Sequence, residues 1–243
     1  MPILLSNRRR VVPEIMDRPD VAEADHLDAL EGLRRINEKS MAAEQIARPI
    51  IEMARRQQLT RISIVDAACG GGDVPIGVAQ RAKSAGVDVE LTLVDRSDTA
   101  LAAAKTAADR AAISCQCVCA DLMDRWPQIH ADVVTSSLFL HHIPDGAGVA
   151  KFLGEAKTVA RRAIVISDLR RARMGWLVAW FGGRMLSGSK IVHHDGPVSV
   201  RAAWTLGEMK KFAQDARLAG ARITRSFPWR MLLVWEPMGE QNA

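Results

Sequence analysis

The sequence predicts an α/β protein built on a doubly wound, Rossmann-like, mostly parallel sheet. A short apolar run, 62–65, ends in an acid, and three consecutive glycines follow before a helix opens near 74. Glycines in such a turn let the backbone bend tightly and approach a ligand. From 87 to 168, strand and helix patterns alternate, which favours right-handed crossovers between parallel strands. The 243 residues, 48% of them hydrophobic, are enough for one sizeable domain.

The part before the glycine turn, 1–57, is expected to be helical. Leucines recur three residues apart within 27–33, and Ser40 is placed to begin a second helix. After the turn, the expected elements are strand 87–95, helix 99–112, strands 113–120 and 131–137, helix 148–161, strand 163–168, helix 206–219 and strands 221–227 and 230–235. Only Pro228 and Trp229 separate the last two strands, which predicts an antiparallel hairpin at the sheet edge.

Composition and charge favour a cytoplasmic protein that does not bind nucleic acid. The net charge of +5 is mild and is typical of a solvated basic surface, and no nucleic-acid motif is present. No apolar run reaches the roughly 18 residues that a spanning helix needs. Residues 1–10 lack the basic start, long apolar stretch and cleavage site of a signal peptide.

Three of the four cysteines, Cys115, Cys117 and Cys119, alternate along one predicted strand. Residues two apart in a strand are separated by about 6.6 Å, whereas thiolates that share a zinc ion all lie about 2.3 Å from it. Three thiolates on a straight strand therefore cannot converge, and we expect no metal ion. We interpret these cysteines as small buried hydrophobes of a core strand.

Polar residues gather where the predicted strands end, which is where doubly wound sheets bind ligands. Asp95 closes a strand 23 residues after Gly72, near the spacing of about 20 expected for an acid that binds a ribose diol. Asp121, Asp168 and the serines at 136–137 follow other strands.

The glycine turn does not complete a dinucleotide fingerprint. Counted from Gly70, the third glycine position falls on Pro75; counted from Gly72, the middle position is Val74. The turn therefore lacks a well-formed binding site for the pyrophosphate of NAD, which disfavours an NAD(P)-dependent oxidoreductase.

Four motifs resemble those of class I S-adenosylmethionine-dependent methyltransferases. Segment 65–73 looks like their first motif, and Asp95 matches their ribose-binding acid. Segment 119–122 is similar to the part that holds adenine, and 131–145 to the fourth-strand motif. The motifs occur in the order and at the spacings of this family over about 60–170. The predicted terminal hairpin is also consistent with the family.

The resemblance implies a transferase that binds S-adenosylmethionine and transfers its methyl group. It implies cofactor contacts for Asp66, Ala68, Cys69, Gly70, Gly72, Asp95, Arg96, Ala120, Asp121, Leu122, Ser137 and Leu138. The family usually has glycine where Ala68 stands, and we expect its methyl group to constrain the turn. The single domain is expected to comprise a helical cap (1–57), a cofactor-binding core (58–168), a lid or substrate insertion (169–205) and a terminal helix and hairpin (206–243).

Histidines near the expected site are candidates for a catalytic base, because imidazole titrates near neutral pH. His142 and His141 directly follow the fourth-strand motif, although packing or helix capping would also explain them. The expected substrate-binding residues are Arg170, Trp176, His193 and His194, and the last two are expected in a loop.

The segment 168–186 leads from three arginines into tryptophans, a phenylalanine and aliphatic residues. It suits a lid over an apolar substrate, an interfacial helix at a membrane surface, or a core or dimer helix. A looser resemblance to polyketide- or phenolic-lipid-associated methyltransferases favours O-methylation of a phenolic or polyketide-derived hydrophobic molecule in secondary metabolism. C-methylation of a quinone precursor and a non-catalytic binding protein are the alternatives, and the chain is expected to be a monomer or a homodimer.

Overall fold

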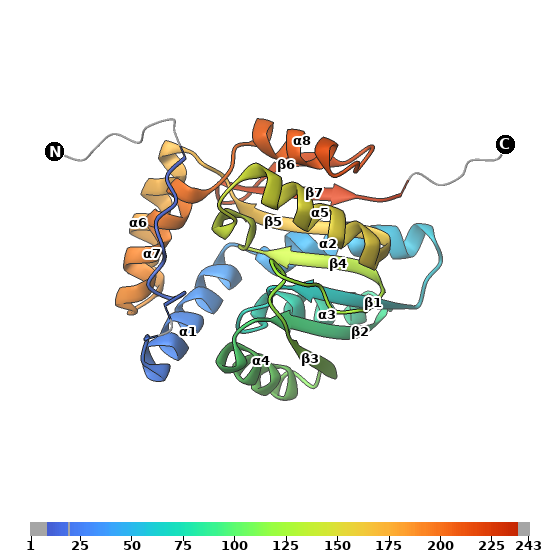
Figure 1. Cartoon of the computed structure of the whole chain (residues 1–243). Coiled ribbons are helices and arrows are strands. Elements are labelled where there is room, and N and C mark those ends of the chain that lie inside the picture. The colour runs from blue at the N-terminus through green and yellow to red at the C-terminus, as the bar shows by residue number, and fades with distance from the viewer. Residues whose placement is uncertain (1–8, 19, 238–243) are drawn as a thin grey trace.

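A single seven-stranded sheet forms the centre of the protein in the computed structural model, which describes residues 9–18 and 20–237 (Figure 1). The strands are β1 (Arg61–Ala67), β2 (Asp88–Asp95), β3 (Cys115–Cys119), β4 (Ala131–Ser137), β5 (Ala160–Leu169), β6 (Arg222–Ser226) and β7 (Arg230–Trp235). The predicted doubly wound, mostly parallel sheet is confirmed. Residues 1–8, within the stretch where no signal peptide was expected, lie outside the described residues.

The strands follow the order β3-β2-β1-β4-β5-β7-β6 across the sheet. The first five of these pair in parallel, whereas β7 runs antiparallel to both β5 and β6. The predicted hairpin therefore exists and lies at the edge of the sheet. The strand order reverses between β1 and β4, which is the place where such sheets bind ligands.

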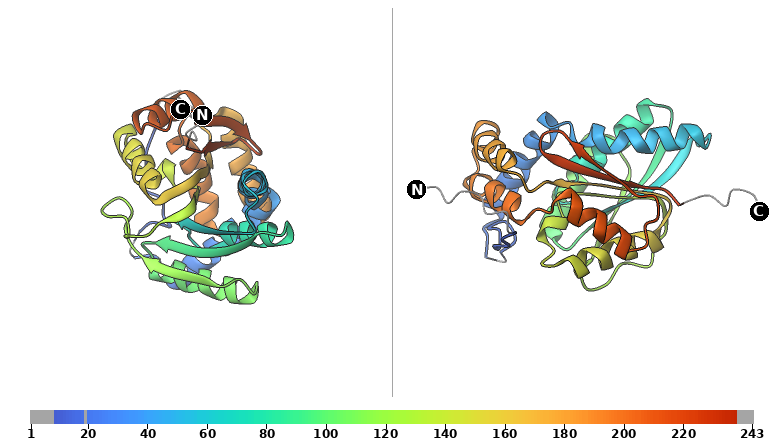
Figure 2. Two further views of the ribbon diagram at one scale, coloured as in Figure 1. Left: turned by 90° about the vertical axis from the view of Figure 1, so that its right-hand side faces the viewer. Right: turned by 90° about the horizontal axis from the view of Figure 1, so that it is seen from above.

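Helices cover both faces of the sheet and one of its ends. They are α1 (Glu23–Lys39), α2 (Ala42–Arg56), α3 (Asp73–Ser84), α4 (Asp98–Arg110), α5 (Gly146–Val159), α6 (Arg173–Leu186), α7 (Lys190–Ala202) and α8 (Leu206–Asp215), with a short 3-10 turn, η1 (Leu140–His142). One apolar core lies between the sheet and α2, α3 and α4, and a second lies under α5 and α8 (Figure 2).

The sequence of α2 illustrates how these cores form. Ile46, Ile50 and Met53 recur at helical spacing and are fully buried. Burying each such side chain contributes about 1.5–3 kcal/mol. This apolar stripe packs α2 onto the sheet beside α3 and fixes α3 under the glycine turn.

Three helices, α1, α6 and α7, gather beyond the carboxyl ends of the parallel strands (Figure 1). A small apolar cluster containing Ala29, Ile191 and Val192 joins α1 to α7. This layer stands over the strand ends, so the expected site is enclosed between it and the sheet.

The prediction of a fully helical N-terminal part is wrong for its beginning. Residues 9–22, as far as they are described, form no helix, and α1 begins only at Glu23. Ser40 does not begin the second helix, because its hydroxyl donates to the carbonyl of Asn37 at 3.1 Å. The residue that precedes α2 is Met41, in a left-handed conformation.

The prediction that the alternating cysteines are buried in a core strand is also wrong. Their strand, β3, is an edge strand, paired only with β2. Cys115 is half-buried, and Cys117 and Cys119 are exposed. Alternation along a strand shows which residues share a face, but it does not show where the strand lies in the sheet.

Candidate active site

The glycine turn after β1 uses backbone conformations that glycine favours. Gly70 and Gly72 have φ values of 52° and 74°. A Cβ atom on Gly72 would lie 2.8 Å from the Cβ of Ala104 on α4, so this position has no room for a side chain. A Cβ atom on Gly70 would meet no heavy atom within 4 Å, so the turn faces open space there.

Ala68, the departure from the family pattern, adopts a φ of 61°. Left-handed backbone is strained for a residue with a Cβ atom, typically by about 1–2 kcal/mol. The expected constraint on the turn is therefore present as backbone strain. The preceding strand and the hydrogen bond from the Cys69 N–H to the Val94 carbonyl (3.0 Å) hold the turn in place.

Asp95 links the end of β2 to the glycine turn. One of its carboxylate oxygens accepts the N–H of Gly70 at 2.8 Å, and the other accepts the N–H of Ser97 at 2.9 Å. The carboxylate thus lies beside the open side of the turn, where a ribose diol is expected. The neighbouring Arg96 forms an ion pair with Asp17 at 3.2 Å.

Asp66 at the end of β1 is buried and accepts a hydrogen bond from the hydroxyl of Thr135. Burial raises its pKa to about 7, and the nearby charges of Asp73 and Asp95 act in the same direction. A cationic group bound beside this carboxyl would favour its ionised form. The ammonium group of a methionine moiety is such a cation.

The residues predicted for the adenine end lie just beyond β3. The N–H of Ala120 donates to the carbonyl of Asp95 at 2.9 Å, which ties this segment to the ribose side. Asp121 is exposed and accepts the N–H of Met123 at 2.8 Å. The side chain of Leu122 is buried in the core, so its backbone alone is available to a ligand.

The end of β4 lies beside the end of β1. The hydroxyl of Ser136 donates to the carbonyl of Ala67 at 2.7 Å and ties β4 to β1. The hydroxyl of Ser137 is buried and has no hydrogen-bond partner among the described residues. Leu138 has a φ of 57° and donates its N–H to the carbonyl of Ser167 at 2.9 Å.

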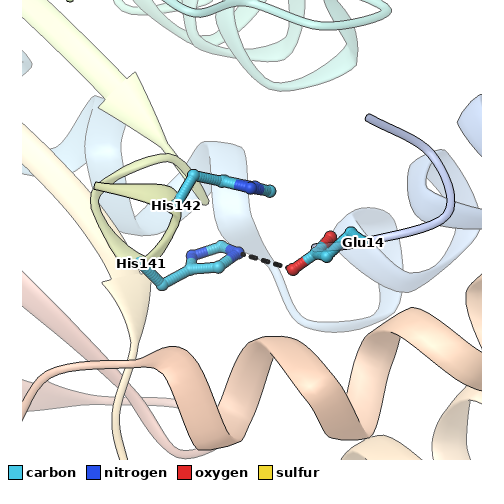
Figure 3. A group of neighbouring side chains, drawn as sticks. All are labelled: Glu14, His141 and His142. Atoms are coloured by element: carbon cyan, nitrogen blue, oxygen red, sulfur yellow. Dashed lines mark ion pairs between the residues drawn. The ribbon is translucent and has the colours of Figure 1, made fainter. Parts of the chain in front are cut away.

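His141 is buried between the carboxylates of Asp168 and Glu14, and Figure 3 shows its pairing with Glu14. Its Nδ1 lies 2.7 Å from Asp168 on β5, and its Nε2 lies 3.6 Å from Glu14. Burial alone would lower the pKa of His141, but the two carboxylates outweigh burial and raise it to about 10. Although burial opposes ionisation of Asp168 and Glu14, this imidazolium lowers the pKa of both.

His142 points into the same space but is partly open to solvent (Figure 3). Its Nδ1 lies 3.0 Å from Asp17, and 28% of its side chain is exposed. The ring of His142 lies against the ring of His141, with centroids 4.3 Å apart. Asp17 therefore holds one ring nitrogen, and the other has no hydrogen-bond partner among the described residues.

Glu14 and Asp17 belong to an N-terminal segment, residues 9–17, that the sequence analysis did not connect to the site. At its start, the guanidinium of Arg9 donates to the carbonyls of Ala202 (2.6 Å) and Ile143 (2.7 Å). It also stacks on the ring of Trp204 at 3.5 Å from the centroid. An acid far ahead of the motifs carries no local pattern that would have identified it.

Glu14, His141 and His142 offer donor atoms that all lie within 4.8 Å of one another, close enough to hold a cation. Binding a metal requires a neutral imidazole with a free lone pair. The raised pKa of His141 keeps its ring protonated near neutral pH, and its charge already balances the carboxylates. We therefore interpret the group as an ion-pair network that fixes the positions of the histidines.

The four predicted substrate-binding residues divide between α7 and the stretch that leads from β5 into α6, and α6 packs against α7. His193 and His194 lie in α7 rather than in a loop: His193 Nε2 lies 2.7 Å from the carbonyl of Ser187, and His194 pairs with Asp195 at 2.8 Å. The run from His193 to Pro197 looked like a loop because of its glycine and proline, but α7 tolerates both residues.

Asp195 has a structural function that the sequence did not reveal. Its two carboxylate oxygens accept the backbone N–H groups of Ile15 and Met16, at 2.9 and 3.0 Å. It thereby anchors the N-terminal segment onto α7. Arg170 follows β5 and donates its N–H to the carbonyl of Trp229 at 3.0 Å, beside the turn of the terminal hairpin. Trp176 lies in α6, and the guanidinium of Arg201 on α7 lies 5.6 Å from its ring centroid.

Comparison with known proteins agrees with this geometry. Residues 64–163 match a family described as "Methyltransferase domain". No curated protein matches the chain. Similar solved structures include the plantazolicin methyltransferase BpumL in complex with SAH, with a TM-score of 0.64 and 15% identity over 87% of this chain and 90% of that chain.

Two further solved structures show the same fold. Magnesium protoporphyrin IX methyltransferase (ChlM) from Synechocystis PCC 6803 with bound SAH has a TM-score of 0.56 and 17% identity, over 83% of this chain and 86% of that chain. A putative O-methyltransferase from Nostoc punctiforme PCC 73102 has a TM-score of 0.55 and 18% identity, over 84% and 59%. At these identities the likenesses establish the fold.

The protein has the fold of class I methyltransferases, and residues 64–163 form a methyltransferase domain with S-adenosylmethionine as its cofactor. The residues present fit this cofactor, because the turn at Gly70 is open, Asp95 lies beside it and the hydroxyl of Ser137 is unpaired. When bound, the cofactor supplies a methyl group made electrophilic by its sulfonium sulfur.

The charge network at His141 predicts how stability changes with pH. The folded-state pKa of about 10 exceeds the ordinary 6.5, so this stabilisation is complete below pH 6.5 and is lost as pH rises through 10. We expect the free energy of unfolding to fall over this interval, by at most about 1.4 kcal/mol per pH unit. Urea unfolding from pH 6 to 10 measures it, and His141→Gln should flatten the slope; an equal slope in that variant would contradict the assignment.

Proposed function

We propose that this enzyme O-methylates a phenolic or polyketide-derived hydrophobic small molecule, with His142 as the general base. The observation that carries the proposal is the pairing of His142 with Asp17 at the end of β4. A carboxylate on one imidazole nitrogen orients the ring and favours proton uptake at the other nitrogen. A hydroxyl nucleophile needs such a base, whereas an already activated carbon does not.

His142 is the better of the two candidate bases. His141 is already protonated by its pairing with two carboxylates and is buried, so it has no lone pair to offer near neutral pH. His142 is partly exposed, and its Nε2 has no hydrogen-bond partner in the part of the chain that the structure describes. We therefore assign His141 to positioning: its ion pairs hold the η1 turn that carries His142.

In the proposed step, the substrate hydroxyl gives its proton to Nε2 of His142 while its oxygen forms a bond to the methyl carbon. The carbon–sulfur bond of the sulfonium breaks, and its electron pair stays on sulfur. The products are a methyl ether, S-adenosylhomocysteine and a protonated His142, which returns the proton to solvent through its exposed edge.

The apolar character of α6 supports a hydrophobic substrate. Met174, Leu177, Phe181 and Met185 are exposed on this helix at spacings of three and four residues, which place them along one side. Exposed arginines accompany this stripe, and α6 contains no acid. Contact with a membrane surface is part of the proposal, as are a cytoplasmic location and a monomeric or homodimeric state. None of the helices described here is long and apolar enough to cross a bilayer.

Fold neighbours include enzymes of compatible chemistry. An O-methyltransferase family 2 protein from Planctomyces limnophilus was solved with apigenin, at 15% identity and a TM-score of 0.54. Such a likeness supports the feasibility of a phenolic acceptor on this fold and does not identify the acceptor here.

Methyl transfer from labelled S-adenosylmethionine to resorcinol-type lipids and quinol precursors tests the proposal. We expect label in a methyl ether, located by mass spectrometry and NMR. Label on a ring carbon would replace the O-methylation proposal by C-methylation of a quinone precursor. Cofactor binding without transfer to any acceptor would favour a non-catalytic binding protein, and absence of cofactor binding by calorimetry would overturn the proposal altogether.

A further inference from the structure

Three buried polar groups at or near the strand ends, where the cofactor is expected, have no hydrogen-bond partner among the described residues. They are Nη1 of Arg230 and the hydroxyls of Ser137 and Ser167. Arg230 and Ser167 are buried, with 2% and 0% of their surfaces exposed. Native proteins leave few buried polar groups unpaired, and those that occur call for an explanation such as a ligand.

Strand register places all three on one face of the sheet. Ser137 of β4 pairs directly with Ser167 of β5, and Arg230 of β7 pairs with Leu169, two residues further along β5. Side chains two apart in a strand share a face. On that face, the hydroxyl of Thr135, two residues before Ser137, donates to Asp66 at the glycine turn.

Hydrogen bonds tie the guanidinium of Arg230 to the start of α3. Its Nη2 donates to Oδ1 of Asn37 at 2.7 Å, and the amide nitrogen of Asn37 donates to Asp73 at 3.0 Å. Asp73 directly follows Gly72 and begins α3. Asn37 therefore links the guanidinium of Arg230 to Asp73, the residue that follows the glycine turn.

This guanidinium lacks a direct anionic partner. No carboxylate lies within 4 Å of it among residues 9–18 and 20–237, and Asp168 and Asp73 act on it only from a distance. Burial lowers the pKa of Arg230 to about 10, so the cation persists at neutral pH but is costly. An unpaired buried cation is stabilised strongly by an incoming anion.

We infer that Arg230 binds the carboxylate of the methionine end of S-adenosylmethionine through Nη1, with the hydroxyls of Ser137 and Ser167 beside it. The turn at Gly70 and Gly72 seats the methionine moiety, and Asp66 on the same face suits its ammonium group. A charge-assisted bond of this kind contributes about 1.5–3 kcal/mol. The inference rests on the cofactor alone and not on O-methylation or on His142.

Calorimetry with S-adenosylmethionine and decarboxylated S-adenosylmethionine, which lacks only the carboxylate, tests it. For Arg230→Met we expect a loss of affinity for S-adenosylmethionine of about 10- to 100-fold, which is the above range converted at tenfold per 1.4 kcal/mol. Affinity for the decarboxylated ligand should change little. Ser167→Ala should also lower the ratio of the two affinities, S-adenosylmethionine over the decarboxylated ligand, but by a smaller factor.

The matched control is Arg162→Met. Arg162 pairs with Asp132 at 2.9 Å, near the opposite ends of β4 and β5, so its loss should not alter the ratio. Circular dichroism and thermal melting verify folding; if Arg230→Met does not fold, Arg230→Lys carries the same ratio test. Equal losses for both ligands would reduce Arg230 to a structural residue. An unchanged ratio with a raised KM for the acceptor would assign Arg230 to an acidic group of the substrate and overturn the inference.

Discussion

Replacing His142 by glutamine lowers kcat for methyl transfer by about 10²- to 10⁴-fold, the range that a general base contributes. Glutamine can still accept a hydrogen bond from the acceptor hydroxyl but cannot take its proton. The KM for S-adenosylmethionine should change little, because the predicted cofactor contacts lie at the ends of β1, β2, β3 and β4 rather than on η1. Initial rates with the acceptor found in the labelling experiment, measured across pH, provide the test.

The control is His130→Gln, which alters an exposed histidine in the loop before β4 and should leave kcat unchanged. Asp17→Asn should lower kcat less than His142→Gln, because it loosens the orientation of the ring but retains the base. Asp17→Glu should recover part of the loss. Near-normal turnover in His142→Gln would exclude the base assignment and favour an acceptor whose nucleophile is already activated.

Replacing Asp95 by alanine weakens binding of S-adenosylmethionine and S-adenosylhomocysteine by at least about 100-fold. Two ribose hydroxyls that donate to a carboxylate contribute about 1.5–3 kcal/mol each. The change also removes the acceptor for the N–H of Gly70, so the glycine turn loses part of its support. Titration calorimetry with S-adenosylhomocysteine measures the affinity directly, without turnover.

The matched control for this change is Asp88→Ala, at the exposed opposite end of the same strand, β2. It removes an equal charge but no group near the turn, so the affinity should stay at the wild-type value. Full affinity in Asp95→Ala would mean that the ribose is held elsewhere and would undermine the assignment of the cleft.

Local pattern was sufficient to predict the sheet and the polar residues that stand at its strand ends. Strand ends are readable because an apolar run stops at a polar residue, as at Asp66 and Asp95, and parallel strands bring their ends together. The same logic gave Ser137. The sequence does not show whether a strand lies at the edge or in the centre of the sheet, because this depends on which strands pair. The burial predicted for the cysteines of β3 is wrong for that reason.

The groups that shape the other side of the site come from distant parts of the chain. Glu14 and Asp17 reach the histidines from more than 120 positions away, and Arg230 enters from the last strand. Each is an ordinary charged residue in its local context. Only the packing of the N-terminal segment on α7, and of β7 on β5, gives them a function, and no periodicity in the sequence reports such contacts.

The close seating of the N-terminal segment has a practical consequence for recombinant work. The guanidinium of Arg9 is held by Trp204 and by main-chain carbonyls, only five residues ahead of Glu14. An affinity tag at the amino end therefore lies close in sequence to the attachment that brings Glu14 and Asp17 to the histidines. Screening for acceptors is better done with the purification handle at the carboxyl end, beyond β7.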